Sequence, residues 1–139
     1  MHLKQIGIIH SPYKTKKEAP KQGKFNDDIS ELEIFDEYKA GLKDVESLTH
    51  LIVLYWGSKA DRSSLETTPP WSSEKKGIFS TRSPNRPNPI AFCVAEVIQV
   101  SENKIQVKNL DALDQSPLLD IKAYSAEIDS YPEAKRKDK

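Results

Sequence analysis

The stretch IAFCVAEVIQVSENKIQVKNL, residues 90–110, contains two apolar segments joined by a short polar turn. Residues 90–100 are rich in β-branched and aromatic side chains, which favour a strand. Ser101-Glu102-Asn103 has the composition of a turn, and apolar side chains alternate with polar ones after it. This pattern predicts an antiparallel β-hairpin.

The flanking sequence extends this hairpin into a sheet. Further strands are predicted at residues 5–9, 30–35, 51–56 and 118–124. The run Leu51–Trp56 is apolar throughout and is interpreted as buried on both faces. The spacing of Tyr38, Leu42 and Val45 predicts a short helix within residues 37–48. Because strands do not alternate with helices, we predict a mainly β fold: one small antiparallel β-barrel with one or two short helices, not a Rossmann fold.

The composition narrows the class of protein. The chain has 139 residues, the size of one domain, and its 21 basic and 21 acidic residues give a net charge of zero. A neutral chain is not expected to coat nucleic acid non-specifically. No secretory signal and no apolar run of membrane-spanning length is visible, and Cys93 is the only cysteine, so we expect a cytoplasmic protein without a membrane partner. The three histidines lack ligand-like spacing, so no metal site is expected.

The stretch GIFSTRSPNRPNPIAF, residues 77–92, is the main candidate for a binding site and is called the proline-rich signature below. Its three X-Pro units hold polar side chains in nearly fixed directions, which lowers the entropy lost when a ligand binds. Arg82 and Arg86 can each donate two parallel hydrogen bonds to a carboxylate or phosphate. Asn85 and Asn88 can read a purine edge or pair with backbone groups. The alternative is a stiff surface turn whose arginines are only solvated.

The signature closely resembles that of the TrmO/YaeB/TsaA-like family of tRNA methyltransferases. Matching segments are IGIIHSPY (6–13), APKQ (19–22), THLIVLYW (49–56) and LDALDQSPLLDIKAY (110–124). The resemblance covers nearly all of residues 1–129, which it identifies as a TsaA-like β-barrel methyltransferase domain, followed by a charged tail at 130–139. It implies a homodimer that uses S-adenosylmethionine, bound near the subunit interface. The implied reaction methylates N6 of threonylcarbamoyladenosine at position 37, beside the tRNA anticodon.

The resemblance also implies individual cofactor contacts, carried over motif by motif: Pro20, Lys21, Gln22, Arg82, Phe92, Asp114, Gln115, Ser116 and Pro117. Gln115 stands where the family has glycine, so it is expected to adopt a positive φ at a cost, or the turn differs. Many members have Phe-His after the central strand, whereas this chain has Gly57-Ser58, whose backbone groups are candidate replacements. Arg86, Asn85 and Asn88 are candidates for substrate binding.

The catalytic base is left open by the sequence. The substrate nitrogen lies between a purine and a urea-like carbonyl, so it is a poor nucleophile until its proton leaves. The candidates for the base are Asp111, Asp114, His50 and Tyr124. Two other functions remain possible: a methyltransferase of the same fold acting on a small molecule or another RNA, and a non-catalytic module that binds S-adenosylmethionine.

Overall fold

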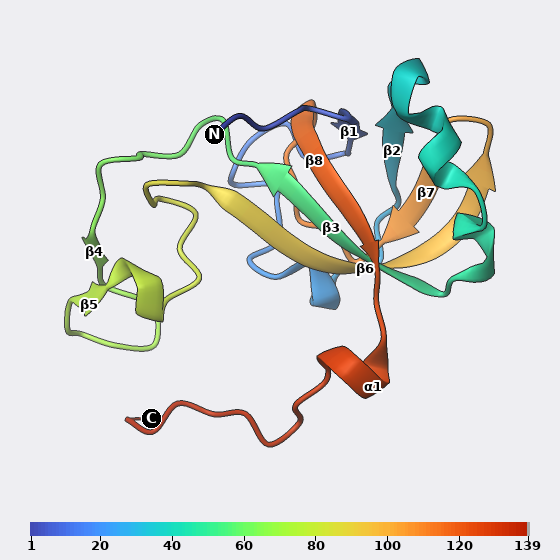
Figure 1. The fold of residues 1–139 in the computed structure, drawn as a ribbon. Helices are drawn as coiled ribbons and strands as arrows, with labels where there is room; N and C mark the ends of the chain where they lie inside the picture. The colour runs from blue at the N-terminus through green and yellow to red at the C-terminus, as the bar shows by residue number, and fades with distance from the viewer. Residues whose placement is uncertain (139) are drawn as a thin grey trace.

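A computed structural model describes residues 1–138 of the chain, except the side chain of Phe25. Its centre is a closed barrel of antiparallel strands in the order β1-β2-β7-β6-β3-β8 (Figure 1). The barrel strands are β1 (Gly7–His10), β2 (Ser30–Ile34), β3 (His50–Trp56), β6 (Ile90–Ser101), β7 (Lys104–Lys108) and β8 (Ser116–Ala123). The predicted fold class is therefore confirmed.

The long strand β6 joins the two halves of the barrel. Its first part, Ile90 to Glu96, pairs with β3, and its last part, Glu96 to Ser101, pairs with β7 across the expected hairpin turn. A register shift between Val97 and Gln99 marks a bulge where the strand changes partner. Bulges bend strands, and this bend allows one strand to serve both sides of the barrel.

The barrel interior is filled by side chains that alternate along the strands. Leu51, Val53 and Tyr55 of β3 point into this core, whereas Ile52, Leu54 and Trp56 are only half-buried. The prediction that this strand is buried on both faces is therefore wrong. One face of an antiparallel barrel strand looks outward, and only the other lies in the core.

The outward side chains of β3 and β6 form a continuous apolar surface. Residues that pair across the two strands share a face, so the outward set is Ile52, Leu54, Trp56, Ile90, Phe92 and Val94. Ile90 is 43% exposed and Phe92 is 47% exposed. We call this set the outer apolar face.

The expected helix at 37–48 is two 3-10 helices, η2 (Asp36–Leu42) and η3 (Val45–Ser47). The apolar face was predicted correctly, because Leu42 is buried and Tyr38 and Val45 pack against the core. The continuous helix was wrong. Asp44 adopts a left-handed conformation with φ of 69°, which interrupts the helix between its two parts.

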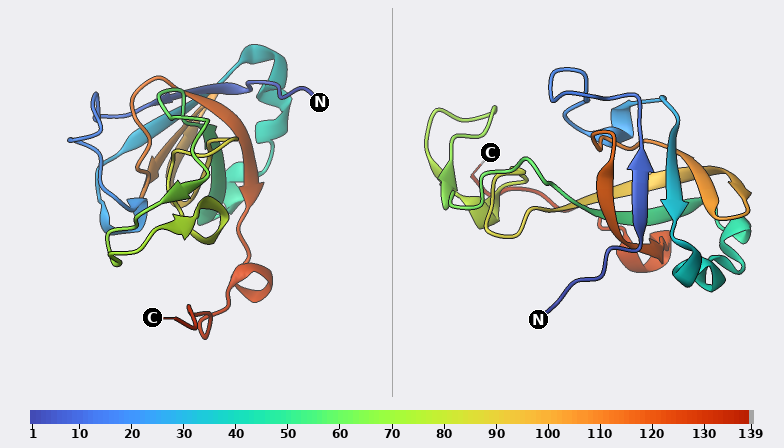
Figure 2. Two further views of the ribbon diagram at one scale, coloured as in Figure 1. Left: turned by 90° about the vertical axis from the view of Figure 1, so that its left-hand side faces the viewer. Right: turned by 90° about the horizontal axis from the view of Figure 1, so that it is seen from above.

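A long excursion between β3 and β6 leaves the barrel and returns (Figures 1 and 2). It contains a two-stranded sheet of β4 (Glu66–Thr67) and β5 (Lys76–Gly77), then η4 (Ile78–Ser80) and the rest of the proline-rich signature. We call residues 57–89 the arm. A loop was expected at 58–76, and this short sheet gives that loop a fixed shape.

The last residues run beside the arm. After α1 (Ala126–Asp129), the chain continues to Arg136, whose guanidinium stacks 4.3 Å from the Trp71 ring centroid and donates to the Ser80 carbonyl at 2.6 Å. Asp138 accepts a hydrogen bond from Lys76 at 3.1 Å. The charged tail is thus attached to the segment that carries the signature.

Candidate functional site

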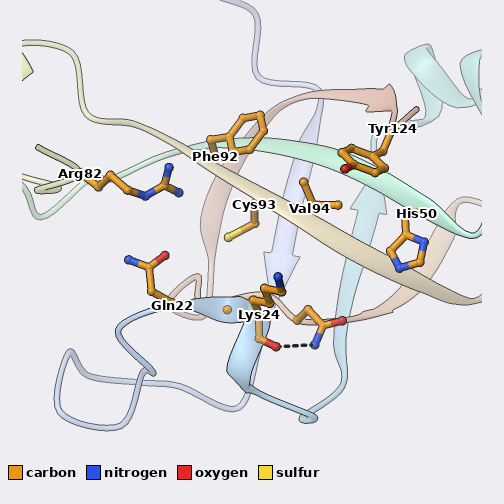
Figure 3. Close-up of a pocket in the computed structure, with 10 residues that line it drawn as sticks. Gln22, Lys24, His50, Arg82, Phe92, Cys93, Val94 and Tyr124 are labelled. Atoms are coloured by element: carbon orange, nitrogen blue, oxygen red, sulfur yellow. Dashed lines mark hydrogen bonds between the residues drawn. The ribbon is translucent and has the colours of Figure 1, made fainter. Parts of the chain in front are cut away.

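A pocket of about 550 Å³ opens beside the first half of β6 (Figure 3). Within the described chain, residues 90–95 pair only with β3, so their other edge faces the loop around η1 (Gly23–Phe25). The pocket lies between that edge and the loop. Its lining residues are Gln22, Gly23, Lys24, His50, Arg82, Phe92, Cys93, Val94, Asn109 and Tyr124.

A close backbone contact holds the loop in place opposite β6. A Cβ atom on Gly23 would lie 2.3 Å from the Asn109 carbonyl oxygen, so only glycine fits there. Asn109 has φ of 70° and donates from Nδ2 to the carbonyl of Asn26 at 2.9 Å and, more weakly, to that of Lys24 at 3.4 Å (dashed in Figure 3). The Asn26 side chain donates in turn to the Leu110 carbonyl at 2.8 Å.

A partly buried hydrogen-bonded cluster lies beneath the pocket and reaches it through Cys93. Asp111 Oδ1 accepts from the Tyr55 hydroxyl at 2.5 Å and from the Cys93 thiol at 3.0 Å. Burial, followed by the nearby Asp111 charge, raises the pKa of the Cys93 thiol to about 12. The same two causes raise the pKa of Tyr55. Cys93 and Tyr55 therefore stay protonated at neutral pH and serve as hydrogen-bond donors to Asp111.

The polar side chains of the rim come from three segments distant in sequence. The Arg82 guanidinium points toward Phe92 and Cys93 (Figure 3), and among residues 1–138 it has no hydrogen-bond or ion-pair partner. His50 and Tyr124 stand at the other end of the pocket, with ring centroids 6.4 Å apart in an edge arrangement. His50 Nδ1 lies 2.9 Å from Thr49 Oγ1. The pocket thus joins a free cation, apolar surface and two groups able to exchange protons.

The other polar residues of the signature hold the arm together. Arg86 donates to the carbonyls of Thr81 and Ser83 at 3.2 and 3.1 Å. The Asn85 side-chain oxygen accepts from the Asp61 backbone N–H at 2.9 Å, and that of Asn88 accepts from Arg62 at 3.4 Å. These contacts give all three predicted substrate-binding residues a structural role, and none of them lines the pocket.

The turn from Asp114 to Pro117 forms a second cluster, next to the end of β1. Asp114 accepts from the Lys14 ammonium at 2.6 Å and from the Ser11 N–H at 2.9 Å. The Lys14 hydrogen bond is the main reason that the pKa of Asp114 lies below its usual range. Gln115 has φ of 69°, so the positive φ expected at this position is confirmed.

The predicted cofactor residues therefore do not all lie at one site within this single chain. Gln22, Arg82 and Phe92 line the pocket, and Pro20 and Lys21 precede Gln22 on its loop. The turn at 114–117 lies outside the lining, and so do Gly57 and Ser58 on the arm, where the Gly57 N–H bonds the Pro89 carbonyl at 2.8 Å.

Of the four base candidates, His50 and Tyr124 line the pocket and Asp111 lies beneath it. Asp114 lies elsewhere, in the second cluster.

Sequence reasoning missed five lining residues: Gly23, Lys24, Cys93, Val94 and Asn109. Gly23 directly follows the APKQ segment, and its close approach to Asn109 depends on a contact between residues 86 positions apart, which no local pattern reveals. Among the described residues, no group of three or more His, Cys, Asp or Glu side chains is arranged to hold a metal ion.

Comparisons with known proteins bear on this arrangement. Residues 8–130 match the model of the tRNA-methyltransferase O N-terminal domain. The chain belongs to the TrmO family. An Archaeoglobus fulgidus relative named S-adenosyl-L-methionine-binding protein is 55% identical over 129 residues, which are 93% of each chain. The Escherichia coli tRNA (adenine(37)-N6)-methyltransferase is 32% identical over 143 residues, covering 95% of this chain and 61% of that protein.

Solved TrmO structures share the fold. A crystal structure of TrmO aligns with a TM-score of 0.84 and 25% identity, covering all of this chain and 64% of that one. TrmO from Pseudomonas aeruginosa aligns with a TM-score of 0.81 over 97% of this chain and 60% of that one. The chain thus spans less than two thirds of these longer TrmO proteins, although it spans nearly all of the Archaeoglobus relative. No helix within residues 1–138 is long and apolar enough to cross a membrane.

Proposed function

We propose that this TrmO-family chain is an S-adenosylmethionine-dependent methyltransferase that modifies N6 of threonylcarbamoyladenosine at position 37 of tRNA. The observation that carries this proposal is the pocket beside β6. It brings together Gln22, Arg82 and Phe92, one residue from the APKQ segment and two from the proline-rich signature. The names of the Archaeoglobus and Escherichia coli relatives support the cofactor and the tRNA substrate.

The residues of the pocket fit the cofactor chemically. The unpaired Arg82 guanidinium suits the methionine carboxylate, and the apolar sides of Phe92 and Val94 suit a purine ring. The unpaired edge of β6 adds backbone donors and acceptors that suit the polar edge of that ring. When bound, S-adenosylmethionine supplies an activated methyl group. The protein's part is to orient the acceptor nitrogen and to exclude water.

Among the four candidates for the base, the geometry favours His50. Asp111 Oδ1 accepts from Tyr55 and Cys93, and Asp114 is held by Lys14 outside the pocket. His50 lines the pocket, and its Nε2 has no hydrogen-bond partner within the described chain. A neutral imidazole can accept the proton of the substrate nitrogen near neutral pH. In this role Tyr124 orients the ring edge-on.

We further propose a homodimer formed through the outer apolar face. This face is apolar across two strands and borders the pocket through Phe92 and Val94, and large exposed apolar surfaces of this kind mark interaction sites. A second copy would also explain the separation of the predicted cofactor residues, if its Asp114–Pro117 turn completes the pocket of the first. The tRNA substrate and the single cysteine support a cytoplasmic location.

The cofactor and the reaction require separate measurements. Arg82→Ala is expected to weaken S-adenosylmethionine binding in isothermal titration calorimetry by at least tenfold, because it removes a charge-assisted contact, and Arg82→Lys should recover part of the affinity. His50→Ala is expected to bind the cofactor normally and to lose methyl transfer.

Mass spectrometry of tRNA nucleosides after incubation decides the reaction. If threonylcarbamoyladenosine gains no methyl group from cofactor-loaded protein, the tRNA assignment fails, and a small-molecule or other RNA substrate, or a non-catalytic role, replaces it.

A further inference from the structure

The segment from Lys14 to Lys24 concentrates positive charge in a chain that is neutral overall. It contains five lysines and one glutamate, a net charge of +4, so the rest of the chain sums to −4. All five lysine residues are exposed. In the right-hand view of Figure 2 this blue segment projects beyond the barrel. We call it the lysine loop.

The acidic groups that contact this part of the chain leave most of the loop's lysines unpaired. The Glu18 carboxylate accepts from the backbone N–H groups of Lys14 and Thr15 and from the Thr15 hydroxyl. Asp114 pairs with Lys14 alone, and beyond the loop Asp28 accepts from the Tyr13 hydroxyl. Within residues 1–138, the remaining lysines have no ion-pair partner: Lys16, Lys17, Lys21 and Lys24.

The loop is also held in a defined shape. The Lys14–Asp114 pair and the Glu18 hydrogen bonds fix its start. Its end is fixed by the close approach of Gly23 to Asn109. Four free ammonium groups are therefore presented from an anchored segment, which lowers the ordering cost of binding a polyanion.

The lysine loop leads directly into the pocket, because Gln22, Gly23 and Lys24 form one of its walls (Figure 3). We propose that Lys16, Lys17, Lys21 and Lys24 bind the RNA phosphates that flank the modified nucleotide. Lysine ammonium groups contact phosphates as point charges and position an RNA without reading its sequence. This inference rests on the proposed function and adds where the RNA backbone docks.

The test compares two charge-matched double variants. Lys16→Gln with Lys17→Gln removes two charges from the lysine loop and spares Lys21 and Lys24, which adjoin the cofactor pocket. Lys39→Gln with Lys43→Gln removes two exposed charges from η2 and the residue after it. Affinity for purified tRNA carrying threonylcarbamoyladenosine is measured by fluorescence anisotropy across a series of KCl concentrations. S-adenosylmethionine affinity is measured by calorimetry in parallel.

The lysine-loop variant is expected to bind tRNA at least several-fold more weakly at low salt. In a plot of log affinity against log salt concentration, the negative slope should become shallower by about 0.7–0.9 for each phosphate contact removed. Its cofactor affinity should match that of the wild type, and the η2 variant should behave as wild type in both assays. Equal tRNA affinity and slope for the two variants would overturn the inference even if the wild type methylates tRNA. Lysine-dependent binding without methyl transfer would support the surface and refute the proposed reaction.

Discussion

Substitution of Gly23 by alanine tests whether the contact with Asn109 builds the pocket wall. The added Cβ would lie 2.3 Å from the Asn109 carbonyl oxygen and 2.9 Å from its carbon. Ordinary contacts at this atom begin near 3.4 Å, so the two backbone segments would have to separate by about 1 Å. Both Asn109 atoms belong to the backbone, so no side-chain rotation relieves the overlap.

The cost of Gly23→Ala follows from two effects. Overpacking of a fitted contact costs about 1–3 kcal/mol. The separation also strains the hydrogen bonds from Asn26 to Leu110 and from Asn109 to Asn26, each worth about 0.5–1.5 kcal/mol. We expect the free energy of unfolding to fall by about 2–4 kcal/mol. Because the wall moves, S-adenosylmethionine affinity should also fall.

Urea denaturation followed by circular dichroism measures the loss of stability, and calorimetry measures cofactor binding. Gly41→Ala is the matched control, because a Cβ there meets nothing within 4 Å. Alanine is favoured over glycine in a helical turn, so this control should be neutral or stabilising by up to about 1 kcal/mol. Equal unfolding free energies for the Gly23 variant and the wild type would show that the contact does not shape the wall.

Three further outcomes are expected. The pKa of Asp114 is lowered in the folded protein, so its stabilising effect is full above its unfolded pKa and is lost as pH falls through the folded pKa. The Asp114→Asn variant should therefore be less stable than wild type at pH 7. In urea titrations its unfolding free energy should fall less than that of wild type between about pH 5 and pH 2. Tyr55→Phe should lower the unfolding free energy by about 1–3 kcal/mol, because the partly buried Asp111 loses a donor; an unchanged urea midpoint would contradict this. Arg136→Ala should increase proteolysis of the arm without unfolding the barrel; an unchanged cleavage rate would show that the tail does not hold the arm.

The barrel was predictable because its determinants are local. Alternation of apolar residues, turn composition around Glu102 and the absence of long helical periods are all visible within short windows. The errors have local causes too. An apolar run such as Leu51–Trp56 fits a strand buried on one face as well as one buried on both. The residues near Asp44 in the sequence do not predict its left-handed conformation.

The candidate site was predictable only in part. The proline-rich signature and the APKQ segment indicated Arg82, Phe92 and Gln22, and the barrel places all three on one pocket. The same signature also indicated Arg86 as a candidate for substrate binding, yet its guanidinium bonds the carbonyls of its own loop. Residue type and spacing cannot distinguish an arginine that binds a ligand from one that satisfies backbone groups, because the difference depends on where the chain folds back.

The sequence alone determined the kind of molecule: its strand content, its family motifs and the lysines before Gly23, all properties of neighbouring residues. Only the tertiary structure decided where these features meet. β7 ends at Lys108, opposite Glu96, so the edge of the first half of β6 stays open, and the Gly23–Asn109 contact closes the other side. The pocket exists because backbone segments far apart in sequence approach within van der Waals distance, and that approach is set by the closure of the barrel.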